Sequence, residues 1–195
     1  MTDIHHRRSM RLKGYDYSQA GAYFITICTQ NREMLLGKIT VGADPSVCPQ
    51  MIFNDAGKMA EKWYLKLSDK FSDIENDLYI VMPNHFHCII QKIATTNSIV
   101  GADPCVCPDN QFNKHAEQGE HTGSPLRRVI QWFKTMTTNE YINNAKQNDW
   151  RSFSGKLWQR NYYEHVIRSE SDLNKIREYI VNNPLHWTTD ENYIN

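Results

Sequence analysis

Two apolar segments separated by only two residues constrain the fold of this chain more than any other feature of its sequence. Asp77–Met82 and His85–Ile90 are dominated by residue types that favour β-strands. Pro83 and Asn84, which lie between them, are turn-forming residues. Because a two-residue connection allows only a tight chain reversal, the two segments are predicted to be adjacent antiparallel strands.

Periodic apolar patterns predict the elements that surround this strand pair. Within 54–70, apolar residues recur every four positions, as one buried face of a helix requires. The other predicted elements are, in chain order, a buried strand at 23–29, a shorter stretch at 34–39 that extends a hairpin, a helix from 124 to about 143, an extended or irregular segment at 158–167, and a last helix that starts at 171 and is ended by Asn183 and Pro184. Antiparallel strands with helices packed on the sheet form an α+β domain, and a ferredoxin-like sandwich is its simplest version.

The composition fits one domain over residues 1–195, with loop insertions near 41–49 and 94–123. The chain is 40% hydrophobic, which suffices for a core. No stretch approaches the roughly 18 apolar residues of a membrane span, and the first residues form no apolar signal peptide, so a cytoplasmic protein is expected. Since 22 basic residues balance 22 acidic ones, binding to nucleic acid would require a local basic face.

His85 and His87 form the first candidate functional feature. Alternate residues of a strand point to the same face, so these two imidazoles are predicted to lie side by side while Phe86 anchors the strand in the core. Two adjacent imidazoles make a bidentate platform for a metal ion. The alternative is a pair of surface histidines without a ligand.

Tyr179 and Asn183, near the end of the last predicted helix, form the second candidate feature. Residues four positions apart share a helix face, so a phenol and an amide are predicted to project together. The alternative is that Tyr179 packs against the core and Asn183 caps the helix before Pro184.

Four segments, which include both features, match the motifs of one known family in the family's order. They are Tyr23–Thr26, Val81–Ile90, Leu157–Arg168 and Tyr179–Pro184. In this combination the chain resembles the single-tyrosine HUH transposases, and specifically the REP-associated tyrosine transposases. The resemblance implies the HUH endonuclease fold and a nucleoid-associated transposase, a site-specific endonuclease and strand transferase that acts on single-stranded, hairpin-forming DNA.

The resemblance also implies roles for individual residues. His85 and His87 would hold a divalent metal, Mg²⁺ or Mn²⁺, with Asn183 as a third, polar ligand. Tyr179 would be the nucleophile, because it alone among the nearby tyrosines has the amide partner four residues on. Its attack on a phosphate polarised by the metal would leave a 5′-phosphotyrosine, which a DNA 3′-hydroxyl can reverse. Because members of the family resemble obligate dimers, the resemblance also implies a homodimer.

Basic and aromatic residues outside these motifs are candidate DNA contacts. Tyr162 and Tyr163 are interpreted as aromatic packing or base stacking, and Glu164 and His165 as polar packing. The basic candidates, for which solvated surface is the alternative interpretation, are Arg7, Arg8, Arg11 and Lys13 of the N-terminal arm, Arg127, Arg128 and Lys134 of the second predicted helix, and Arg160 and Arg168 of the family-like segment.

Two other functions stay open at this stage. One is a related HUH nickase or strand transferase with a host role in place of mobility. The other is a non-catalytic DNA-hairpin-binding protein on the same fold. That protein would need neither Tyr179 nor the histidine pair, yet the sequence contains all three residues.

A nine-residue sequence at 41–49 recurs at 100–108 with a single difference. At the protein level it predicts a pair of turns, or a metal site that uses Cys48, Cys105 and Cys107, although the spacing of the last two is unusual for zinc.

At the DNA level, the codons GGG-GCA-GAC for Gly-Ala-Asp are the reverse complement of GTC-TGC-CCC for Val-Cys-Pro. We hypothesise that mobile palindromes inserted in frame at tolerant loops. The nucleotide sequence of the gene tests this, since codons that cannot pair would rule the hypothesis out.

Overall fold

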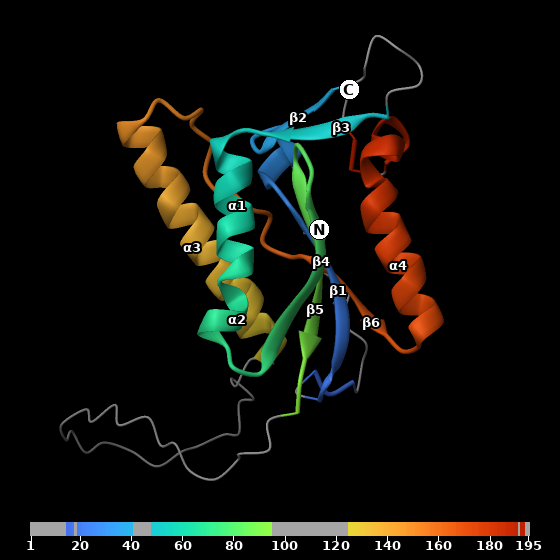
Figure 1. Ribbon diagram of the computed structural model, residues 1–195. Helices are drawn as coiled ribbons and strands as arrows, with labels where there is room; N and C mark the ends of the chain where they lie inside the picture. Colours follow the sequence, from blue (N-terminus) through green and yellow to red (C-terminus); the bar gives the residue numbers. More distant parts are fainter. Residues whose placement is uncertain (1–14, 18, 41–47, 95–124, 191, 194–195) are drawn as a thin grey trace, which may run out of the picture.

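The computed structural model describes residues 15–17, 19–40, 48–94, 125–190 and 192–193 (Figure 1). Its elements are β1 (Gly21–Cys28), the 3₁₀ turn η1 (Gln30–Arg32), β2 (Gly37–Thr40), β3 (Gln50–Phe53), α1 (Asp55–Leu65), α2 (Leu67–Lys70), β4 (Ile74–Val81), β5 (His85–Lys92), α3 (Pro125–Gln147), β6 (Tyr163–Ile167), α4 (Glu170–Asn182) and the 3₁₀ helix η2 (Asn183–Thr189).

The main sheet is antiparallel, with the strand order β4-β5-β1-β6. With α1 between β1 and β4 and α3 between β5 and β6, both the chain order and the strand order are those of a ferredoxin-like fold. Helices α1, α2 and α3 lie on one side of the sheet and α4 lies on the other (Figure 1). The predicted α+β fold, with helices packed on an antiparallel sheet, is confirmed.

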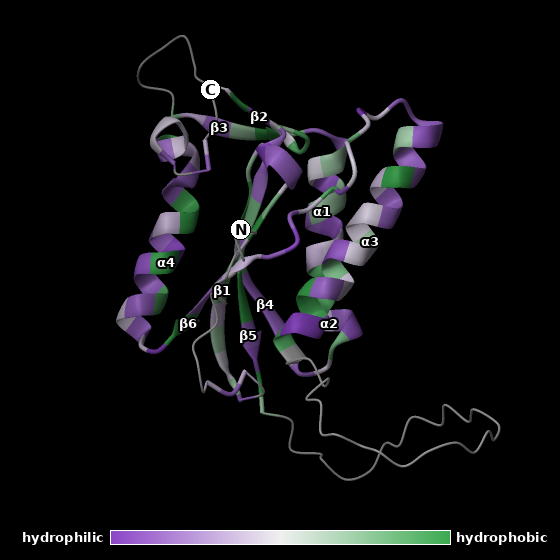
Figure 2. Cartoon of the chain, turned by 180° about the vertical axis from the view of Figure 1, so that it is seen from behind, coloured by the Kyte–Doolittle hydropathy of each residue, from purple (hydrophilic) through white to green (hydrophobic). Residues whose placement is uncertain are grey.

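Each face of the sheet carries its own apolar cluster, because strand side chains alternate between faces. On the side of α1 and α3, Ile25 and Phe86 belong to the larger buried cluster. On the side of α4, Phe24 and Ile89 pack with Ile180 in a smaller cluster. Figure 2 shows hydrophobic residues alternating with hydrophilic ones along α4, as expected of a helix that covers one face of a sheet.

The turn between β4 and β5 is held by a neighbouring segment as well as by its own hydrogen bond. The Met82 N–H donates to the His85 carbonyl at 2.8 Å, which closes the turn. The Asn84 carbonyl accepts from both the N–H and the hydroxyl of Thr29, each at 2.9 Å. These contacts confirm the predicted strand pair, and they place His85 as the first residue of β5.

The helix predicted over 54–70 is in fact two helices. α1 begins after Asn54, whose side-chain oxygen accepts from the Gly57 N–H at 2.9 Å. It ends at Leu65, where the Asn76 amide donates to the carbonyls of Tyr64 and Leu65 at 3.1 Å each. Because these carbonyls already have a donor from another element, the chain can break after Leu65 and resume as α2.

The last helix begins one residue earlier than predicted and ends where predicted. Ser169 caps α4 by accepting from the Asp172 N–H at 3.1 Å, so the helix starts at Glu170. It ends at Asn182 with Asn183 as its C-cap, and the chain continues as η2, whose first turn contains Pro184, where a missing N–H costs little. Asn183 keeps a helical backbone (φ −56°, ψ −41°), so its side chain stays on the same helix face as Tyr179.

The remaining predictions concern the smaller elements and the insertions. The stretch at 34–39, predicted to extend a hairpin, contains the start of β2, which pairs antiparallel with β3 in a sheet separate from the main one. The extended segment before α4 contains β6, which pairs with β1. The predicted insertions near 41–49 and 94–123 lie almost entirely outside the described residues. Within the described part of the chain, no helix is both long and apolar enough to cross a membrane.

We predict that Phe86→Ala will lower the free energy of unfolding by about 3–5 kcal/mol, the usual cost of removing a buried aromatic ring. Phe86 is fully buried, and its ring centroid lies 5.3 Å from those of Tyr64 and Phe133. Urea unfolding measures the effect, with Leu65→Ala, at an exposed position of α1, as the control. A loss below about 1 kcal/mol, typical of surface positions, would contradict this account of the core.

Candidate active site

Two buried imidazoles lie side by side on the α4 face of the sheet. His85 and His87 come from β5, and their exposed fractions are 0% and 1%. Their ring centroids are 4.4 Å apart. The surface-histidine alternative is therefore wrong, because both rings are inside the protein. Burial of two adjacent polar rings is costly unless each has a partner.

The hydrogen bonds of Asn84 determine which nitrogen of His85 carries the proton. The Asn84 amide nitrogen donates to the carbonyls of Arg32 (3.2 Å) and Asn192 (2.8 Å). Its oxygen therefore faces His85 Nδ1 at 2.8 Å and accepts the Nδ1 proton. This leaves the lone pair on His85 Nε2, which is buried and has no hydrogen-bond partner among the described residues. A lone pair exposed by such an outer partner is typical of a metal-binding histidine.

His87 is oriented by β1. Its Nδ1 lies 2.8 Å from the Thr26 hydroxyl, and its ring stacks on Phe24 with centroids 5.3 Å apart. Its Nε2 faces the Tyr179 hydroxyl at 3.4 Å. In the tautomer whose Nδ1 proton is donated to Thr26, His87 presents the lone pair of Nε2, as His85 does.

Burial keeps both imidazoles neutral. It lowers the pKa of His85 to about 4, against the opposing effect of the Asp190 carboxylate. Burial, followed by the proximity of His85, also holds the pKa of His87 well below its usual value. Since a metal binds only the neutral ring, neither histidine has to lose a proton at neutral pH before it can bind one.

Asn183 and Asp190 approach the histidines from the end of α4 and from η2. The Asn183 amide nitrogen donates to the Asp190 carboxylate at 3.1 Å. The Asn183 oxygen is buried and has no hydrogen-bond partner among the described residues. The Asn183 side chain also favours the charged form of His85, although burial dominates the pKa of that ring. The predicted proximity of Asn183 to the histidine pair is consistent with these contacts.

His85, His87 and Asp190 form a group that could hold a metal ion. Each offers one ligand atom, and these atoms all lie within 4.8 Å of one another. Two imidazoles and a carboxylate suit first-row divalent metals such as Mn²⁺ better than Mg²⁺, which prefers oxygen ligands. The buried, unpartnered His85 Nε2 and Asn183 oxygen fit the same interpretation. Sequence analysis missed Asp190, because no strand or helix periodicity relates it to the histidines.

Tyr179 lies over this group but stays accessible. Its side chain is 42% exposed. Its ring makes edge contacts with Phe24 and His87, with centroids 5.9 and 5.3 Å apart. Its hydroxyl is 3.4 Å from the Asp190 carboxylate, the same distance that separates it from His87 Nε2. The hydroxyl can therefore reach both the candidate metal group and a bound molecule.

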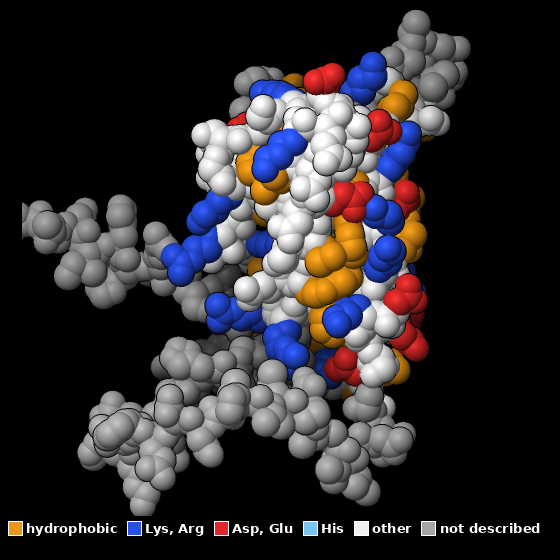
Figure 3. Space-filling view, turned by 90° about the vertical axis from the view of Figure 1, so that its left-hand side faces the viewer, with side chains coloured by type: hydrophobic (Ala, Val, Ile, Leu, Met, Phe, Trp, Pro, Cys, Tyr) orange, Lys and Arg blue, Asp and Glu red, His pale blue; other side chains and the backbone are white. Residues whose placement is uncertain are grey.

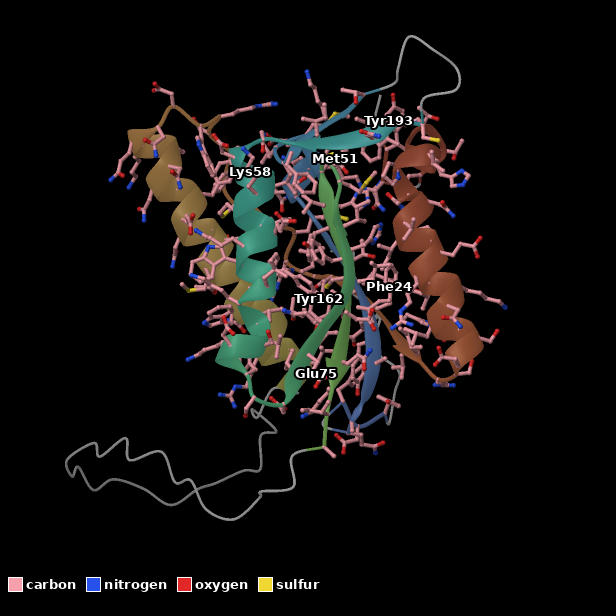
Figure 4. All side chains as sticks on the ribbon, in the orientation of Figure 1. Phe24, Met51, Lys58, Glu75, Tyr162 and Tyr193 are labelled. Carbon is pink, nitrogen blue, oxygen red and sulfur yellow. The ribbon has the colours of Figure 1, made fainter. Side chains whose placement is uncertain are left out.

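The two tyrosines at the start of β6 point to opposite sides of the sheet. Tyr162 packs with the larger cluster, and Figure 4 shows it on the side of α1 and α3. Phe24 is labelled on the α4 side in the same view. Tyr163 lines a cavity on the α4 side together with Phe24, His87 and Tyr179. Of the two, only Tyr163 shares the face of the histidines.

The basic residues predicted to contact DNA are spread over several parts of the molecule. Arg127 and Arg128 are exposed on α3. Figure 3 shows the side of the molecule on which α3 lies, where Lys and Arg side chains are interspersed with Asp and Glu. Arg160 and Arg168 are exposed before and after β6. Arg7, Arg8, Arg11 and Lys13 lie outside the described residues. Among the described residues, the structure records no contact between these basic side chains and the histidine pair.

The Lys134 side chain makes structural contacts within the protein. Its ammonium donates to the carbonyls of Gln159 at 2.9 Å and Asn161 at 3.1 Å, and it lies over the Tyr162 ring. Burial lowers its pKa to about 8. These contacts hold the segment that leads into β6, and contact of Lys134 with DNA stays a prediction.

A known structure has a similar fold. A REP-associated tyrosine transposase, solved bound to a REP hairpin, superposes with a TM-score of 0.52 and 16% identity. The match covers 91% of this chain and 74% of the other. At this level of identity the similarity establishes a shared, transposase-like fold.

A curated relative is similar over almost the whole chain. A comparison with models of protein families finds no match. A Haemophilus influenzae protein, described as uncharacterized, is 36% identical over 191 residues, which is 98% of this chain and 95% of that protein. This chain therefore belongs to the same family as that Haemophilus influenzae protein.

Proposed function

We propose that this protein is a metal-dependent tyrosine transposase that cuts and rejoins single-stranded DNA beside a hairpin. The observation that carries the proposal is the position of the Tyr179 hydroxyl, 3.4 Å from both His87 Nε2 and the Asp190 carboxylate. A tyrosine that only packs against the core needs no hydroxyl beside a potential metal group. The transposase-like fold supports the same reaction class.

In this proposal His85, His87 and Asp190 hold a divalent metal, Mn²⁺ or Mg²⁺, and the Asn183 oxygen completes the group. A metal bound there would supply positive charge to an oxygen of the scissile phosphate. Asn84 and Thr26 fix the two rings so that each Nε2 faces the site. Because both rings are buried and neutral, the only formal charge that the group contributes is that of Asp190.

Asp190 can accept the proton that Tyr179 loses in the cleavage step. The Tyr179 oxygen forms a bond to the scissile phosphorus while the bond from phosphorus to the DNA 3′-oxygen breaks. The Tyr179 proton passes to the Asp190 carboxylate, which lies within reach of the hydroxyl, and the departing 3′-oxygen takes a proton from solvent water to become a hydroxyl. The product is a 5′-phosphotyrosine, and attack by another 3′-hydroxyl reverses the step without external energy.

The solved transposase with a similar fold is bound to a REP hairpin, which supports a substrate of the same class here. We propose hairpin-forming single-stranded DNA as the substrate of this chain too. Exposed basic residues, including Arg127, Arg128, Arg160 and Arg168, are candidates to contact its phosphates. A homodimer and association with the nucleoid belong to the same proposal.

We predict that the wild-type protein will bind Mn²⁺ in the absence of DNA, and that His87→Gln and Asp190→Asn will each weaken binding by more than about 10-fold. Loss of an outer-shell partner alone typically costs this much or more. Electron paramagnetic resonance of free Mn²⁺ measures the affinity. His165→Gln is the matched control, because His165 lines the same cavity but lies outside the metal group. Equal affinity of wild type and His87→Gln would refute the metal site.

We predict that wild type with Mn²⁺ will form a covalent adduct with a single-stranded hairpin oligonucleotide, and that Tyr179→Phe will form none. The substitution keeps the ring contacts with Phe24 and His87, so the fold should be retained. Denaturing electrophoresis of a labelled oligonucleotide detects the adduct. Tyr163→Phe is the control, since it removes a hydroxyl from the same cavity and should leave the adduct in place.

Other outcomes would redirect the proposal. An adduct that persists in Tyr179→Phe but disappears in Tyr163→Phe would make Tyr163 the nucleophile. Tight hairpin binding without any adduct would favour the non-catalytic hairpin-binding protein. Neither cleavage nor hairpin binding would overturn the transposase proposal.

A further inference from the structure

A cavity of about 620 Å³ opens beside Tyr179 and extends along the α4 face of β6. The sheet register explains its position. Thr26 pairs with His87 on one side and with Tyr163 on the other, and Phe24 pairs with His165. Since paired residues project to the same face, the cavity runs across three strands from the candidate metal group to Tyr163 and His165.

Aromatic rings form much of the wall of this cavity. Tyr163 is 45% exposed, and its ring meets the Phe24 ring edge-on with centroids 6.3 Å apart. Tyr179 meets Phe24 in the same manner from α4. Exposed aromatic rings that converge on a cavity offer flat surfaces on which another ring can stack.

The far end of the cavity is polar and rich in hydrogen-bond acceptors. The Asp172 carboxylate accepts from His165 Nε2 at 2.9 Å, and this hydrogen bond is the main reason that the pKa of Asp172 is lowered. Asp190, at the other end, adds a second carboxylate to the lining.

Among the described residues that line the cavity, none is Lys or Arg, and the carboxylates are Asp172 and Asp190. Asp190 belongs to the candidate metal group, whereas Asp172 lies beside His165 at the far end. The described lining of the far end therefore offers no Lys or Arg to a phosphate, whereas an aromatic ring with polar edges meets a stacking surface and the acceptor of Asp172.

We propose that this cavity takes one unpaired nucleobase from the nucleotides that flank the scissile phosphate, a subsite that rests on the proposed function. The base stacks on Tyr163, and its edge faces His165 and Asp172. Because the Asp172 carboxylate is a hydrogen-bond acceptor, the cavity favours adenine, cytosine or guanine, which carry an exocyclic amino group, over thymine. The reacting phosphate stays outside, between Tyr179 and the metal group.

The test uses 2-aminopurine, a fluorescent base whose emission falls when it stacks on an aromatic ring. Tyr179→Phe protein, which holds uncleaved DNA, is mixed with hairpin oligonucleotides that carry the probe at each flanking position in turn. We expect strong quenching at one position. Adding Tyr163→Ala should abolish that quenching and weaken binding about 5- to 100-fold, as loss of one stacked base does. Tyr163→Phe should preserve both, and Leu65→Ala, on the opposite side of the sheet, is the exposed-residue control.

A second arm separates failure of the subsite from failure of the proposed function. The adduct assay is repeated with wild type on oligonucleotides that carry thymine or an abasic site at the quenched position. The subsite predicts slower adduct formation for both. Adducts that form normally with every substitution, and with Tyr163→Ala, would overturn the subsite and leave the transposase intact. Quenching that depends on Tyr163 without any adduct would retain the subsite and reject the chemistry. No quenching at any position would overturn the subsite in either case.

Discussion

The pleat of β5 is the constraint on which the candidate site depends. Phe86 and Cys88 belong to the buried cluster under α1 and α3, so His85 and His87 must point to the opposite face. A slip of one residue would bury the histidines in the large core and expose Phe86 to α4, which makes the register strongly specified. The packing of Phe86 between Tyr64 and Phe133 therefore positions two imidazoles that it does not touch.

The second half of the site depends on how α4 ends. α4 ends at Asn182, and η2 follows directly from Asn183. The tighter 3₁₀ path of η2 brings the Asp190 carboxylate back to the Tyr179 hydroxyl and the Asn183 amide. Asn192 then donates its N–H to the same carboxylate at 2.6 Å and accepts, through its carbonyl, from Asn84. One hydrogen-bonded chain thus links the end of η2 to the side chain that orients His85.

The sequence could predict those features that follow from local periodicity. The strand pair follows from β-favouring residue types and a two-residue connection. The paired histidines and the shared face of Tyr179 and Asn183 follow from repeats of two and about four residues. The sequence could not predict Asp190, whose position depends on the 3₁₀ path of η2, nor the break after Leu65, which depends on the distant side chain of Asn76. From the sequence, Lys134 is expected to be a surface cation, but in the structure its ammonium donates to backbone carbonyls.

The distribution of charge determines what each part of the site can bind. None of the described residues that line the cavity is Lys or Arg, so this lining supplies no permanent cation beside the Tyr179 hydroxyl. Binding a phosphodiester there requires positive charge from elsewhere, and His85, His87 and Asp190 form a group suited to a divalent metal. The same lack of Lys and Arg makes the rest of the cavity suitable for an uncharged ring. In the proposed reaction, a metal held by that group would therefore do more than polarise the phosphate, because it would also offset the negative charge of Asp190 beside the DNA.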